Sequence, residues 1–187
     1  MEERDNVLRI LRETKTAIEK EDIVSLKELS NQTIHTASIS QDTDNIAVAV
    51  IVYAISKILE RKNFRDYKQY PVFYKTLKLC ISRAIDALEK DQIDYFRNQL
   101  KCLRKDISGL TGNFKKHIQE VFKRAEINKA SRIYEHGISM QQTARLLGIS
   151  IWELAEYTGQ TGISDVNLNI TMPEKARIKQ ALKIFEK

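Results

Sequence analysis

The chain has 187 residues and a formal charge of +6, and 42% of its residues are hydrophobic and 30% charged. This balance excludes an intrinsically disordered chain, and the length allows one domain or two small ones. The longest apolar run, residues 46–55, is too short for a membrane span, which needs about 20 residues. Two cysteines make no disulfide framework. We therefore expect a cytoplasmic protein without a membrane partner.

Few residues interrupt helices in this chain, which has only six glycines and two prolines. We therefore expect an all-α fold. Apolar residues at helical spacing predict a first helix around Val7 to Ile18, and Asp22 is placed to cap the second. Asp44 is placed to cap a third helix, residues 46–61, which is apolar on nearly every side and should lie at the centre of a bundle. No internal repeat is evident.

The middle of the chain continues this helical pattern. The basic, aromatic stretch 61–70 is expected to cover one end of the bundle, although such a mixture can also stack on single-stranded nucleic acid. Pro71 opens a fourth helix, because its fixed φ suits a first turn. A fifth helix follows Asp91, with apolar residues alternately three and four apart, as is typical of bundle packing.

Two glycines, Gly109 and Gly112, interrupt the pattern after the fifth helix. Glycine disfavours helix by about 1 kcal/mol relative to alanine. We therefore predict two domains: a helical bundle over residues 1–110, for dimerisation or partner binding, and a helix-turn-helix module over residues 113–187.

The predicted module begins with a sixth helix, residues 113–136, that ends at Gly137. The stretch 137–157, GISMQQTARLLGISIWELAEY, then predicts two short helices joined by a turn at Gly148, where a positive φ is favourable only for glycine. Ser139 and Ser150 are placed to cap these helices. The positions expected to face inward are Thr143, Leu147, Ile149, Leu154 and Tyr157, and Ala144 is expected where the two helices cross. Beyond them, the alternating residues 166–170 predict a short strand or wing, and Pro173 a last helix.

The outward positions of the second short helix decide what the module binds. In DNA readers such positions lie in the major groove and normally offer Arg, Lys, Asn or Gln to base edges. Here they are Ser150, Ile151, Trp152, Ala155 and Glu156, and base contacts would come from the first three, so we expect low sequence specificity on double-stranded DNA. The residues assigned to phosphate contacts are Lys123, Arg124, Lys129, Arg132 and Arg145. An exposed tryptophan is equally typical of a protein anchor, so Trp152 and Glu156 are also candidate partner-binding residues.

The stretch 131–157, together with the Gly162–Ile163 pair, resembles the helix-turn-helix of small prokaryotic antitoxins that pair with PIN-domain ribonuclease toxins. The similarity covers roughly the last third of the chain. The matching residues are Tyr134, Gly137, Ala144, Leu147, Gly148, Ser150, Trp152, Glu153 and Leu154. This resemblance implies DNA-linked autoregulation and a PIN-domain toxin as protein partner.

Catalytic chemistry finds little support in the sequence. No phosphate-binding loop, nucleophile elbow or metalloprotease motif is present, and we expect neither an enzyme, a cofactor nor a metal site. Our first interpretation is a DNA-binding regulator, with homodimerisation through the bundle left open. The alternatives are a protein-interaction scaffold anchored by Trp152, and an RNA- or ribosome-associated factor using Lys101, Arg104 and Lys105 on the fifth helix.

Overall fold

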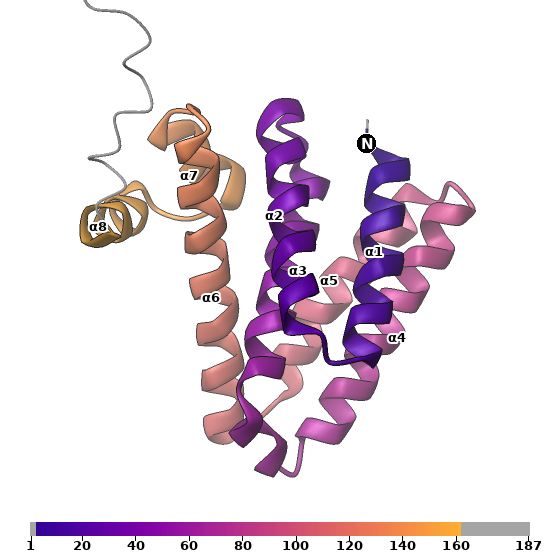
Figure 1. Ribbon diagram of the computed structural model, residues 1–187. Coiled ribbons are helices and arrows are strands. Elements are labelled where there is room, and N and C mark those ends of the chain that lie inside the picture. Colours follow the sequence, from indigo (N-terminus) through magenta and orange to yellow (C-terminus); the bar gives the residue numbers. More distant parts are fainter. Residues whose placement is uncertain (1–2, 162–187) are drawn as a thin grey trace, which may run out of the picture.

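The computed structural model describes residues 3–161, and this part of the chain is entirely helical (Figure 1). Its helices are α1 (Arg4–Glu19), α2 (Ile23–Ser40), α3 (Thr43–Glu60), the 3-10 helix η1 (Lys62–Asp66), α4 (Tyr70–Glu89), α5 (Ile93–Gly109), α6 (Gly112–Glu135), α7 (Met140–Leu147) and α8 (Ile151–Thr161). The expected all-α fold is confirmed for these residues. The predicted strand or wing and the last helix lie outside them.

Side-chain caps explain where two of the bundle helices begin. The Asp22 carboxylate accepts a hydrogen bond from the Ser25 backbone N–H at 3.0 Å and caps α2, as expected. The cap of α3 is Asp42, whose carboxylate accepts from the Asp44 N–H at 2.8 Å. The assignment of this cap to Asp44 was wrong, because Asp44 lies inside the first turn and its carboxylate binds the Arg97 guanidinium.

Helix α3 forms the centre of the core, as its sequence predicts. Thirteen of its eighteen residues are buried, and it packs against both α2 and α6. One end of the bundle is covered by the aromatic connector: Phe64 of η1 is buried against Phe114 and stacks on the ring of His117. The aromatic side chains of this stretch therefore contribute to the core rather than to an exposed stacking surface.

The first six helices consist of two similar halves offset by 70 residues, a repeat that the sequence reading missed. The turn after α1, AIEKEDI from Ala17, corresponds to the turn after α4, ALEKDQI from Ala87. Both turns place the fifth residue, Glu21 or Asp91, at a positive φ (52° and 57°). In both, the next N–H donates to the alanine carbonyl, at 2.9 Å and 2.8 Å. The paired core positions include Val7 and Leu77, Ile10 and Cys80, Leu11 and Ile81, Leu26 and Phe96, Val48 and Ile118, and Ile51 and Val121.

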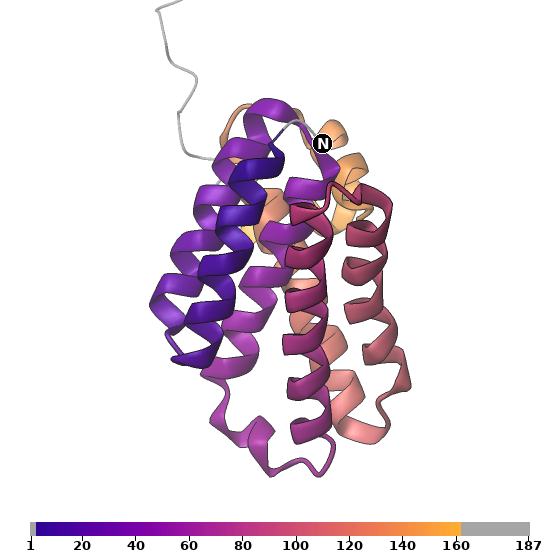
Figure 2. The ribbon, with the colours of Figure 1, turned by 90° about the vertical axis from the view of Figure 1, so that its right-hand side faces the viewer.

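The two halves pack through corresponding helices. Helix α1 contacts α4, and α3 contacts α6 (Figures 1 and 2). The halves differ in their internal packing: α2 and α3 pack closely, whereas α5 and α6 approach each other at few positions, and α4 and α5 pack more closely than α1 and α2. The second half is therefore open between these two helices.

The hydrophobic core continues across the glycines at which we placed a domain boundary. Phe114, Ile118 and Val121 of α6 belong to the same buried cluster as residues of α1 to α5. Gly112 adopts a positive φ of 61°, which suits a change of direction between α5 and α6. Helix α6 is thus both the last helix of the bundle and the support of α7 and α8. In residues 3–161, no helix is long and apolar enough to cross a membrane.

Candidate functional site

Helices α7 and α8 are joined by a tight turn at one end of the bundle (Figure 1). Gly148 ends α7 with a φ of 69°, and the Ile149 N–H donates to the Ala144 carbonyl at 3.1 Å. A Cβ at Gly148 would meet no atom within 4 Å, so the backbone angle and not crowding requires glycine here. The predicted turn is therefore present at the expected residue.

Serine side chains cap both short helices, as predicted. The Ser139 hydroxyl accepts from the Gln142 N–H at 3.2 Å, and the Ser150 hydroxyl accepts from the Glu153 N–H at 3.1 Å. Glu153 returns the interaction by accepting from the Ser150 N–H at 3.1 Å, which completes a reciprocal capping box. The Glu153 carboxylate also pairs with Lys123 of α6 at 2.7 Å. Lys123 first, and then Ser150, lower the pKa of Glu153 to about 2.

The inner side of this pair packs on α6. Ala144 and Leu154 are buried together with Ala130, and Thr143 is fully buried. The remaining positions expected to face inward, Leu147, Ile149 and Tyr157, are partly buried. The Asn128 amide of α6 donates to the Tyr157 hydroxyl at 3.2 Å. These contacts and the Glu153–Lys123 pair fix α8 against the bundle.

The outer side of α8 presents an exposed apolar pair on its first turn. The side chain of Trp152 is 83% exposed and that of Ile151 is 43% exposed. Ser150 and Glu156 are also exposed. The four residues predicted to contact DNA or a protein partner at α8, Ser150, Ile151, Trp152 and Glu156, are thus accessible from solvent.

The cations assigned to phosphate contacts are mostly engaged within the chain. Lys123 pairs with Glu153, Arg124 with Glu120 at 2.5 Å, and Arg132 with Glu135 at 2.9 Å. These pairs lie on the surface. Arg145 is exposed and has no ion-pair partner among residues 3–161.

Lys129 does not lie on the surface, so its side chain is not positioned for the phosphate contact that was predicted for it. Its side chain is completely buried, its Nζ donates to Asn31 Oδ1 of α2 at 2.9 Å, and it lies 4.3 Å from the ring centroid of Tyr53 on α3. Burial first, and then the charge of Arg132, lower the pKa of Lys129 to about 7. Reaching a phosphate would require this side chain to leave the core.

No known family, curated protein or solved structure matches the chain.

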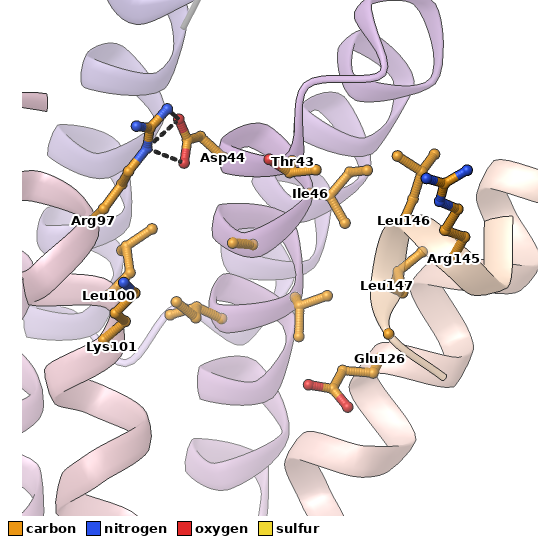
Figure 3. Close-up of a pocket in the computed structure, with 14 residues that line it drawn as sticks. Thr43, Asp44, Ile46, Arg97, Leu100, Lys101, Glu126, Arg145, Leu146 and Leu147 are labelled. Carbon is orange, nitrogen blue, oxygen red and sulfur yellow. Dashed lines mark hydrogen bonds and ion pairs between the residues drawn. The ribbon is translucent and has the colours of Figure 1, made fainter. Parts of the chain in front are cut away.

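A groove beside α7 is a feature that sequence reasoning missed. It has a volume of about 490 Å³ and lies over α3, between α5 on one wall and α6 and α7 on the other (Figure 3).

Among the described residues, no group of three or more His, Cys, Asp or Glu side chains is placed to hold a metal ion. The described surface thus offers two candidates for binding: the exposed face of α8 and this groove.

Proposed function

We propose that α7 and α8 form a protein-binding module in which Trp152 inserts into an apolar pocket of a partner. The observation that supports this most directly is the 83% exposure of Trp152, on a helix whose other side is fixed to α6. An aromatic side chain of this size buries roughly 150–250 Å² in an interface. At about 25 cal/mol per Å², that burial favours association by several kcal/mol.

The charges around Trp152 are largely balanced within the chain. Glu153 and Glu156 lie on α8 close to the indole in sequence, and Lys123 of α6 pairs with Glu153. The exposed indole is therefore the main feature that this face offers to a partner. The capping box and the Lys123 pair hold α8 in place before binding, so little ordering entropy is lost.

The resemblance to antitoxins supplies the first partner to test. A PIN-domain ribonuclease is a protein partner of that family, and an antitoxin-like role would assign α8 to the contact with such a protein. The helical bundle would then support the module structurally. Homodimerisation through the bundle would be independent of the contact that α8 makes.

The test compares Trp152→Ala with Val72→Ala, a change at another exposed apolar residue (70% exposed) on α4. The partner is isolated with the tagged protein from nuclease-treated extract of its native host, purified, and titrated calorimetrically. Trp152→Ala should weaken binding about thirtyfold or more, as at an interface hot spot, while Val72→Ala binds normally. Trp152→Phe should keep part of the affinity. Equal dissociation constants for the two alanine variants would reject the proposal.

DNA binding is the second candidate, and Arg145 is the observation that favours it. This side chain is exposed, is without an ion-pair partner in the described part, and is three residues before the turn that leads into α8. The surface pairs of Lys123, Arg124 and Arg132 contribute little free energy, so phosphates can compete for these cations. Duplex affinity should then fall steeply with added salt and fall further in Arg145→Gln. A flat salt response would exclude this candidate.

A further inference from the structure

Besides the exposed face of α8 and the groove, the described surface carries a pair of histidines from two different helices. His35 lies on α2, and His136 follows the last residue of α6 as its C-cap. The centroids of the two rings are 5.2 Å apart, and the ring planes are tilted by 60°. Both residues are exposed. Two of the three histidines of the chain, far apart in sequence, are therefore side by side at the surface.

Buried contacts fix the backbone on both sides of this pair. Ile34 and Ile133, which lie one and three residues before the two histidines, belong to the same buried cluster. One turn before His35, the Asn31 oxygen accepts a hydrogen bond from the buried Lys129 of α6 at 2.9 Å. The two rings are thus attached to helices that are held together, while their exposure lets each ring turn about its own side-chain bonds.

The distance between the rings suits two ligands of one metal ion. An imidazole nitrogen binds zinc at about 2.0–2.1 Å, which places the ring centroid about 3.2 Å from the metal. Two rings bound in this way at the tetrahedral angle of about 109° have centroids about 5.2 Å apart. The observed separation of 5.2 Å agrees with this value, so the two helices need not move for both rings to bind one ion.

The electrostatic surroundings of the pair also favour a cation. The C-terminal end of a helix carries about half a unit of negative charge, and His136 stands at this end of α6. The charged side chains closest to it in sequence, Arg132 and Glu135, pair with each other at 2.9 Å. They therefore leave the helix end without a net positive charge that would repel a metal ion.

We propose that His35 and His136 together bind a divalent transition-metal ion of the zinc and copper class. Imidazole nitrogen suits these ions, whereas magnesium and calcium prefer oxygen ligands. Water takes the other coordination positions, so a third protein ligand is not required. The ion would join α2 to the end of α6, just before α7 begins at Met140, and would hold the support of α7 and α8 on the bundle. The site does not involve Trp152 and is independent of the protein-binding function.

Calorimetric titration of the full chain with zinc, copper and magnesium chlorides tests this site. We expect one zinc or copper ion per chain, tighter binding of copper than of zinc, and no saturable binding of magnesium. Sedimentation in the presence of zinc separates an ion held within one chain from an ion that joins the exposed histidines of two copies. The first leaves the molecular mass unchanged, and the second doubles it.

Three variants locate the ligands. His35→Gln and His136→Gln should each weaken zinc binding at least about tenfold, since even the loss of an outer-shell partner of a metal ligand costs about 10–100-fold. His117→Gln removes the third imidazole, near the other end of α6, and should bind zinc as the unmodified chain does. Zinc should also raise the melting temperature of the unmodified chain but not that of His35→Gln. Absence of saturable zinc and copper binding, a zinc-joined dimer, or equal zinc affinity of His35→Gln and His117→Gln would each overturn the proposal.

Discussion

At the scale of single residues, Lys129 is a charge placed inside the core. It occupies the position in the second half that corresponds to the buried Leu59 in the first, 70 residues earlier. The Asn31 oxygen and the Tyr53 ring both favour its protonated form, whereas burial favours the neutral form. The pKa falls to about 7, so burial has the larger effect.

Because of Lys129, the free energy of unfolding of the protein should increase with pH in the alkaline range. Its ordinary pKa is 10.5, so between pH 7 and 10.5 the unfolded chain binds a proton that the folded chain has released. Unfolding then takes up a proton, and the free energy of unfolding should rise with pH by up to about 1.4 kcal/mol per unit. Urea unfolding at several pH values between 7 and 10 measures this slope.

The matched variant for this prediction is Lys129→Met, which keeps a long side chain and removes the titrating group. Its free energy of unfolding should lack the rise that Lys129 contributes, and Lys116→Gln, at an exposed position, should retain it. Identical slopes in the unmodified protein and in Lys129→Met would show that Lys129 stays protonated in the folded state across this range.

The sequence contains a signal for the burial of Lys129. Ile118, Phe122, Ala125 and Lys129 follow each other at spacings of three and four, so they share the buried face of α6. A lysine on such a stripe is usually placed at the surface because of its charge. The compensating partners come from α2 and α3, distant in sequence, and could not be identified from α6 alone.

At the scale of the element, the backbone at Gly148 determines how α8 leaves α7. Gly148→Ala should destabilise this turn by about 1–2 kcal/mol, because a Cβ disfavours the left-handed conformation. Gly159→Ala adds the same methyl group to α8 in open space, where alanine favours helix by about 0.5–1 kcal/mol. Amide hydrogen exchange across α8 should therefore quicken in the first variant and slow in the second. Changes of the same sign in both would contradict this assignment.

The short helices were predictable because their signals are local. Ser139, Gly148 and Ser150 act on backbone groups within a few residues of themselves, so their types and spacing were sufficient. The cap of α3 was less certain, because two aspartates stand two residues apart. Asp44 is drawn into the bundle by Arg97, which is 53 residues away, and Asp42 is left to cap the helix.

At the scale of the whole molecule, neither half of the bundle has a complete core of its own. The interface is formed mainly by α1 against α4 and α3 against α6, with further contacts of α2 with α6 and of α3 with α5. A fragment of residues 1–69 should therefore be largely unfolded, since a core of this size is marginal even when complete. Mixed with residues 70–187, it should regain helical circular dichroism and a cooperative thermal transition. A cooperative transition of the 1–69 fragment alone would show that the halves fold independently.

The repeat was not recognised from the sequence because the two halves bury corresponding positions but fill them with different residue types. Val7 corresponds to Leu77 and Ile10 to Cys80, so helical periodicity is retained while identity is lost outside the turns. The groove was beyond sequence reasoning for a different reason. The divergence of α5 from α6 is a property of packing, and both helices have ordinary amphipathic patterns.

The position of the one tryptophan has an optical consequence. Because the indole of Trp152 is already in contact with water in the folded chain, its emission should lie at the long wavelength of a solvated indole and change little on denaturation. The seven tyrosines and the peptide chromophore would follow loss of the bundle, while a shift of the tryptophan band to shorter wavelength would signal that another molecule has covered α8.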